Sequence, residues 1–177
     1  MTQPGDGSLT TMTWEGWVKP ETKDGVIMCK YDTQGPDDNS YIISFRDNGF
    51  FKSTAIEYFG GGHSSAITDD SYSEPGEWVY LTSTFDLGGD NFIDQYVDGD
   101  DVPSTIMSNS GDFMRDISIS DDLGRYRPEA GTKYTDSVID EVRWSKIVRN
   151  DAWIKTSFNT MDDPSGFMDF GSEETGP

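Results

Sequence analysis

The sequence predicts an all-β protein, a sandwich or a barrel, on three observations. Short stretches of alternating apolar and polar residues recur along the chain, and 9–20 is the clearest. Turn residues (Gly, Pro, Asn and Asp) separate these stretches. Only the stretch 150–158, NDAWIKTSF, has a helical pattern, and Asn150 or Asp151 can cap it. Many short strands with one short helix near the C-terminus are typical of a single all-β domain.

The first half of the chain contains four of the predicted strands. In the first, at 9–20, Met12, Trp14, Gly16 and Val18 share one face. A second strand follows at 26–31. The stretch 41–59 is typical of a hairpin, because Asn48-Gly49 is a strong two-residue turn signal. The glycine-rich stretch 60–65, GGGHSS, is expected to be a loop.

The second half continues the same pattern. Strands are predicted at 77–86 and 91–102, with turns at Gly88-Gly89 and Asp98-Gly99. The region 103–135 has only weak strand signals, chiefly at 112–120, DFMRDISIS. A late strand is expected at 137–145, SVIDEVRWS, just before the predicted helix.

The composition narrows the range of partners. With 13 basic and 33 acidic residues the formal net charge is -20, which argues against nucleic acid and anionic membrane surfaces as partners. This charge allows cations, calcium above all, and it fits adaptation to high salt. The single cysteine, Cys29, excludes an internal disulfide and is expected to be buried. No stretch is long and apolar enough to span a membrane.

Five segments occur in an order that resembles a known family. They are MTWEGWVKPET, GVIMCKYD, GEWVYLTSTFD, QYVDGDDV and VIDEVRWSKIVRNDAWI. Together they resemble a laminin-G-like domain of the concanavalin A-like lectin/glucanase superfamily, as found in large bacterial and archaeal surface proteins. The resemblance implies a jelly-roll sandwich of two antiparallel sheets, one of them curved to give a concave face. We expect this domain at 9–174, with 1–8 as an extension or cloning remnant and 175–177 as a linker.

Two adjacent carboxylates, Asp140 and Glu141, raise the question of catalysis. Neighbours in a regular strand point to opposite faces, so these two could not form the carboxylate pair that a glycosidase requires. The strand pattern Glu-x-Asp-x-x-Glu of related β-glucanases does not occur, and the only histidine, His63, falls in the expected glycine-rich loop. We therefore expect no catalytic residue and no enzyme activity. Glu141 is expected to pair with Arg143 or Lys19.

The resemblance also implies a structural calcium ion. In the superfamily the aspartate of the late strand contributes oxygens to a calcium near the N-terminal segment. The matching residue is Asp140, and the stretch GDGS could add the Asp6 side chain or backbone carbonyls. Calcium takes roughly six to eight oxygen ligands. The alternative is that Asp140 only accepts hydrogen bonds from a neighbouring turn.

Aromatic residues in predicted loops are the candidates for ligand binding. Sugars present apolar C–H faces that stack on aromatic rings, while their hydroxyls hydrogen-bond to Asp, Asn and Arg. The candidates are Tyr58, Tyr72, Tyr126, Arg125 and Arg127, of which the two arginines could recognise an anionic group. Ion pairs with nearby aspartates are the alternative for these arginines. Aromatic residues of the predicted strands, Trp78 and Trp144 included, are expected in the core.

Fold does not fix function, so three hypotheses stay open. The leading one is a non-catalytic carbohydrate-binding module of a larger extracellular or cell-surface protein. The second is a structural or adhesive module that binds protein, and the third is a polysaccharide-cleaving enzyme on the same fold. Stacking aromatics exposed on the concave face or its rim would favour the first hypothesis. We expect the isolated domain to be a monomer.

Overall fold

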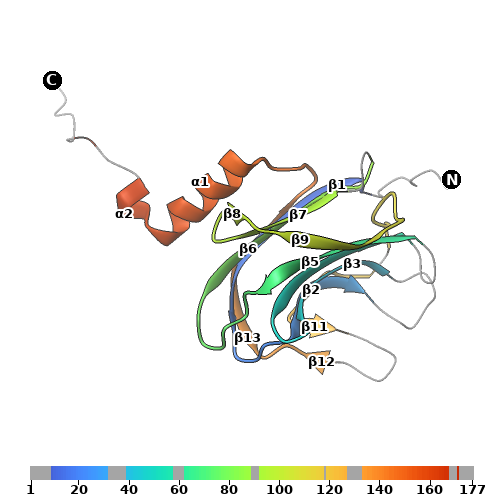
Figure 1. Cartoon of the computed structure of the whole chain (residues 1–177), viewed down its shortest axis with the longest axis horizontal. Coiled ribbons are helices and arrows are strands. Elements are labelled where there is room, and N and C mark those ends of the chain that lie inside the picture. The colour runs from blue at the N-terminus through green and yellow to red at the C-terminus, as the bar shows by residue number, and fades with distance from the viewer. Residues whose placement is uncertain are drawn as a thin grey trace.

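The computed structural model describes residues 9–31, 39–57, 62–88, 92–117, 119–126, 133–167 and 171. These residues form two antiparallel sheets that pack face to face, with a helix beside them (Figure 1). The predicted jelly-roll sandwich is thereby confirmed. Within the described ranges, no helix has the length and apolar character needed to cross a membrane.

The five-stranded sheet joins the two ends of the domain. Its order is β13-β1-β6-β7-β8, with β1 at Thr11–Pro20, β6 at Val79–Asp86, β7 at Phe92–Val97, β8 at Asp100–Asp101 and β13 at Ser137–Ser145. β1 therefore pairs with β6 along one edge and with the late strand β13 along the other. Asp98 and Gly99 both have positive φ, 51° and 77°, which is what a tight hairpin turn between β7 and β8 requires.

The six-stranded sheet contains the predicted hairpin. Its order is β10-β2-β3-β4-β5-β9, with β2 at Gly25–Tyr31, β3 at Asn39–Arg46, β4 at Phe50–Ile56, β5 at His63–Ser71, β9 at Ser104–Asn109 and β10 at Asp122–Leu123. The turn from β3 to β4 runs through Asp47, Asn48 and Gly49, all with positive φ. The hairpin prediction is confirmed. A separate two-stranded ladder pairs β11 (Arg125–Tyr126) with β12 (Lys133–Tyr134).

Two strand assignments made from the sequence are wrong. The expected loop at 60–65 contains the start of β5: His63 is exposed, as predicted, but Ser64 and Ser65 are buried between β4 and β9. Small polar residues that look like a loop by composition here allow close strand packing. In the stretch 112–120, the described residues contribute only an isolated bridge between Met114 and Leu9, and the edge strand is β9 instead.

Aromatic and aliphatic side chains from both sheets fill the core. The largest fully buried members include Trp14, Phe45, Phe51, Phe85 and Leu81. Cys29 is buried, as predicted. Trp78 and Trp144 are 45% and 47% exposed, so their predicted core positions are wrong. Trp78 precedes β6, and Trp144 lies in the edge strand β13, where one side of the strand has no neighbour.

Helix α1 (Asp151–Asp162) covers the outer face of the five-stranded sheet. The Asn150 Oδ1 atom accepts a hydrogen bond from the Trp153 backbone N at 2.9 Å, which confirms the predicted cap. Ile154 is fully buried. The Phe158 ring lies 5.8 Å from that of Trp17 and 5.9 Å from that of Tyr80. A four-residue helix, α2 (Pro164–Phe167), follows.

Candidate functional site

Strand β13 contains a bulge at the two adjacent carboxylates. Ile139 and Val142 both pack against the core, although a regular strand would place residues three apart on opposite faces. The register with β1 shifts between Glu15 and Trp17, and Glu141 has a φ of 50°. Asp140 and Glu141 therefore both lie on the outer side of the sheet. The prediction of opposite faces is wrong because the strand is not regular there.

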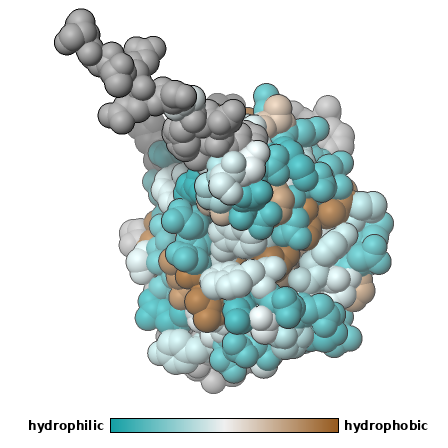
Figure 2. Space-filling model, turned by 90° about the vertical axis from the view of Figure 1, so that its left-hand side faces the viewer, coloured by the Kyte–Doolittle hydropathy of each residue, from teal (hydrophilic) through white to brown (hydrophobic). Residues whose placement is uncertain are grey.

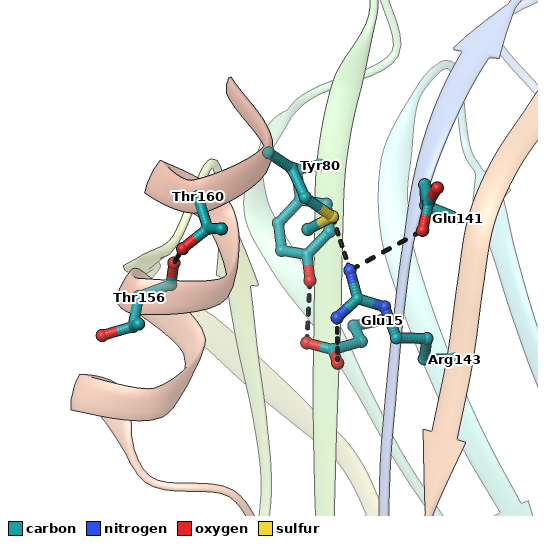
Figure 3. Close-up of polar contacts among 7 residues, drawn as sticks. Glu15, Tyr80, Glu141, Arg143, Thr156 and Thr160 are labelled. Carbon is teal, nitrogen blue, oxygen red and sulfur yellow. Dashed lines mark hydrogen bonds and ion pairs between the residues drawn. The ribbon is translucent and has the colours of Figure 1, made fainter. Parts of the chain in front are cut away.

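Glu141 belongs to a polar network beneath α1 (Figure 3). Arg143 Nη2 lies 3.9 Å from Glu141 Oε2, and Arg143 Nη1 lies 3.9 Å from Glu15 Oε1. The predicted pairing of Glu141 with Arg143 is confirmed. Buried Glu15 also accepts a hydrogen bond from the Tyr80 hydroxyl at 2.7 Å. Burial, and then this hydrogen bond, raise the pKa of Tyr80. The arginine also contacts Met161 of α1, so the network helps to hold the helix on the sheet.

Asp140 faces a second feature, which we call the helix-side pocket. This open hollow has a volume of about 280 Å³ and is lined by Trp17, Trp78, Asp140, Met161 and Asp162. Asp140 Oδ1 accepts a hydrogen bond from the Glu141 backbone N at 2.8 Å. The donor is the next residue of the same strand and not a neighbouring turn, so the alternative role of Asp140 also stays a prediction.

Calcium needs more oxygens than the helix-side pocket provides. Among the described residues, no group of three or more His, Cys, Asp or Glu side chains is placed to hold a metal. Two aspartates are short of the roughly six to eight oxygens that calcium requires. Asp6, the other predicted ligand, lies outside the described residues. The described residues alone do not fit a calcium site, and calcium at Asp140 stays a prediction.

A more enclosed pocket lies where the ends of β2 and β3 meet the β11–β12 ladder, and we call it the rim pocket. It has a volume of about 240 Å³ and is lined by Asp24, Gly25, Val26, Phe45, Arg46, Tyr126, Tyr134 and Thr135. Two tyrosine rings, one guanidinium and one carboxylate therefore surround a single open space. This set can stack on an apolar ring face and hydrogen-bond to hydroxyl groups around it.

Local packing positions the Tyr126 ring and the backbone beside Tyr134. The Tyr126 ring leans on Tyr31 of β2, with 5.0 Å between the ring centroids. Beside Tyr134, the Thr135 hydroxyl donates a hydrogen bond to the Val26 carbonyl. A Cβ on Gly25 would lie only 2.6 Å from Thr135 Cγ2, so this close approach requires glycine. Tyr134 itself is 77% exposed and presents most of its side chain to solvent.

Two other ligand-binding candidates, Arg125 and Tyr72, do not line this pocket. Arg125 forms an ion pair with the buried carboxylate of Asp122, which is the alternative that the sequence left open. Tyr72 packs against the core, and burial, followed by the nearby charges of Asp70 and Asp69, raises its pKa. Tyr58 and Arg127 lie outside the described residues.

Sequence reasoning missed Arg46, Tyr134 and Trp78. Arg46 directly precedes the Asp47-Asn48-Gly49 turn, and a cation at the end of a hairpin strand is a signal that could have been used. Tyr134 lies in the region where the strand pattern was weakest. Trp78 was assigned to a strand that begins one residue later, at Val79.

Comparison with known proteins agrees with this architecture. The sequence model described as the concanavalin A-like lectin/glucanases superfamily, of the laminin G type, matches residues 2–155. No curated protein matches the sequence significantly. The native heptameric SAP-like pentraxin from Limulus polyphemus is 14% identical with a TM-score of 0.62, over 85% of this chain and 70% of the pentraxin.

Two further solved structures are domains of larger assemblies. Domains LG4-5 of the mouse laminin alpha1 chain are 14% identical with a TM-score of 0.57, over 85% of this chain and 39% of theirs. The binding domain of botulinum neurotoxin DC, solved in complex with SialylT, is 12% identical with a TM-score of 0.57, over 86% of this chain and 36% of its own. The chain thus spans less than half the length of these two structures. At such identities the likeness shows the fold alone.

The sequence match and the fold lead to the same assignment. The matched residues extend from before β1 to within α1 and include both sheets. The chain therefore belongs to the concanavalin A-like lectin/glucanase superfamily and is a laminin-G-like domain.

Proposed function

We propose that the protein is a non-catalytic carbohydrate-binding module and that the rim pocket is its glycan site. The observation that carries the proposal is the pairing of Tyr126 and Tyr134 with Arg46 and Asp24 around one open pocket. Small-molecule sites are concave and mainly apolar, with a few polar groups that fix orientation. The rim pocket has this composition.

The chemistry of the pocket suits a sugar ring. Tyrosine offers an apolar ring with a polar hydroxyl, so a sugar can stack on it and hydrogen-bond at its edge. Arg46 is a planar donor for sugar oxygens, and Asp24 is an acceptor for sugar hydroxyls. One oxygen of Asp24 already accepts a hydrogen bond from the Asn48 backbone N at 2.9 Å, which orients the carboxylate.

The comparisons support a binding role. Laminin G domains, a pentraxin and toxin binding domains share the fold, and one of the toxin domains was solved with SialylT. From the same likeness we propose that the chain is a module of an extracellular or cell-surface protein, while the monomeric state of the isolated domain stays a prediction from the sequence. On the side shown in Figure 2, hydrophilic residues predominate and hydrophobic ones form small separate patches.

A glycan array followed by calorimetric titration of the best ligand tests the proposal. Tyr126→Ala and Tyr134→Ala are expected to weaken binding at least about tenfold, because aromatic anchors dominate binding energies. Trp78→Ala, which removes a ring from the helix-side pocket, is the matched control and should leave binding unchanged. If only Trp78→Ala abolishes binding, the glycan site is the helix-side pocket. If no glycan binds, the proposed function is wrong.

A further inference from the structure

We propose that the rim pocket selects an acidic sugar, whose carboxylate or sulfate group is held by Arg46 and Lys52. This inference rests on the proposed function and adds the class of glycan to it. The evidence lies on the outer face of the six-stranded sheet, next to the pocket.

The strand register places the two cations side by side. Phe45 and Phe51 are buried in the core, so their strand neighbours Arg46 and Lys52 lie on the outer face. Lys52 pairs with Ser44, and Arg46 pairs with Phe50. Arg46 and Lys52 are therefore diagonal neighbours on one face, with Cα atoms about 7–8 Å apart, a separation that long side chains can bridge. Arg46 also lines the rim pocket.

These two cations differ from most other described cations in having no ion-pair partner among the described residues. Acidic residues outnumber basic ones 33 to 13, so a basic side chain here has many possible partners. Five described basic residues form ion pairs with carboxylates: Lys23, Lys30, Arg125, Arg143 and Lys155. By contrast, the structure gives neither Arg46 nor Lys52 an ion pair or a side-chain hydrogen bond in the described chain. Lys19 and Lys146 also lack ion pairs, but they do not lie beside a second unpaired cation at a pocket.

The surroundings of Lys52 disfavour the charged form of its amine. The side chain is half-buried, and burial followed by the positive charge of Arg46 lowers its pKa. Asp47 acts in the opposite direction but forms no ion pair with it. An anion placed between the two cations would offset both the burial and the like-charge repulsion. A bound anion would therefore stabilise the charged form of Lys52 beside Arg46.

The helix-side pocket gives a contrast within the same molecule. Asp140 and Asp162 line it together with Trp17, Trp78 and Met161, and no basic residue is among the lining side chains. Carboxylates without partners are expected in a chain of net charge -20, but adjacent cations without partners are not. An acidic sugar would be repelled at the helix-side pocket, whereas beside the rim pocket the two positive charges of Arg46 and Lys52 outnumber the single carboxylate of Asp24.

An array of matched sugar pairs tests the inference. The pairs are glucuronate and glucose, galacturonate and galactose, and sialyllactose and lactose for carboxylates, with 6-sulfated and unsulfated N-acetylglucosamine for sulfate. We expect an acidic member to bind about tenfold more tightly than its neutral counterpart, which corresponds to about 1.4 kcal/mol. The pairs also distinguish carboxylate from sulfate as the group recognised.

Two variants separate the charge effect from stacking. The double variant Arg46→Gln/Lys52→Gln should lose the preference. Lys52→Gln, which leaves the pocket-lining Arg46 in place, should weaken the preference without changing the binding of the neutral member. Lys19→Gln is a matched control that should keep the preference. Equal binding of acidic and neutral members by the wild type would overturn the inference and leave the proposed function standing. A preference that persists in the double variant would also overturn it. No binding to any sugar would remove both proposals.

Discussion

The outer faces of the two sheets differ in whether their charged side chains have partners. On the five-stranded sheet, buried Glu15 accepts a hydrogen bond from Tyr80 and faces Arg143 beneath α1. On the six-stranded sheet, Arg46 and Lys52 have no carboxylate partner among the described residues. A buried charge without a partner is costly, and on the first face the buried charge of Glu15 is satisfied within the fold. The second face leaves its charges available, as a binding surface would.

Tyr80→Phe sharpens the comparison on the five-stranded side. It keeps the buried ring but removes the hydrogen bond to the Glu15 carboxylate, which should cost about 2 kcal/mol. For a domain of this size the midpoint should fall by roughly 4–8 °C. Thermal unfolding followed by circular dichroism measures the fall. Tyr134→Phe, at an exposed ring, is the control and should change the midpoint by less than about 1 °C. An equal effect of the two substitutions would contradict the role of the network.

A calcium ion at Asp140 would remove this difference between the two faces, because the outer face of the five-stranded sheet would then bind a ligand too. A ligand that binds only the folded state at tenfold excess over its Kd stabilises by about 1.4 kcal/mol. The predicted site therefore gives a higher midpoint in calcium than in EDTA, and Asp140→Ala should abolish the difference. Asp136→Ala, at an exposed position near the start of the same strand, should retain it. An equal response of the two variants would place any calcium elsewhere.

Asp94→Asn tests the smallest expected effect, again on the five-stranded sheet. Burial, followed by the charges of Asp101 and Asp151, raises the pKa of Asp94. Because the folded-state pKa lies above the unfolded one, the ionised carboxylate destabilises the fold at neutral pH, and this penalty fades as pH falls through the raised pKa. The side chain is exposed, so solvent screening limits the gain from Asp94→Asn to about 0.5 kcal/mol at pH 7.

Chemical unfolding at pH 7 and at pH 3.5 checks this prediction. The gain should be present at pH 7 and smaller at pH 3.5, where most of the Asp94 carboxyl groups are protonated in both states. Asp86→Asn, which removes one exposed carboxylate at the end of β6, is the matched control for the loss of a charge. A gain that is independent of pH would mean that charge is not its cause.

Sequence periodicity predicted the sandwich because alternation is a local property. The hairpin at Asn48 and the cap at Asn150 were predictable for the same reason, since each is encoded by a few adjacent residues. The bulge in β13 was not, because it depends on how β13 is registered against β1. One extra residue moved Glu141 to the same side of the sheet as Asp140 and overturned the expected separation.

The candidate site was less predictable than the fold. Tyr126 was identified because an aromatic residue in an irregular region lacks an obvious core role. Its companions in the rim pocket come from β3 and β12, which meet only in three dimensions. Likewise, nothing local distinguishes Arg46 and Lys52 from Arg125. Arg125 forms an ion pair with Asp122, whereas the other two have no ion-pair partner among the residues that the structure describes.

The pairing of β1 with β13 also bears on how the chain folds during its synthesis. The two strands are separated by the whole stretch from Pro20 to Ser137. At roughly 5–20 residues per second, a ribosome needs on the order of ten seconds to make that stretch. Throughout this time one edge of β1 has no neighbour, and unpaired edges promote aggregation. The nascent domain can close only after Ser145 has emerged, so chains truncated before β13 should depend on chaperones to stay soluble.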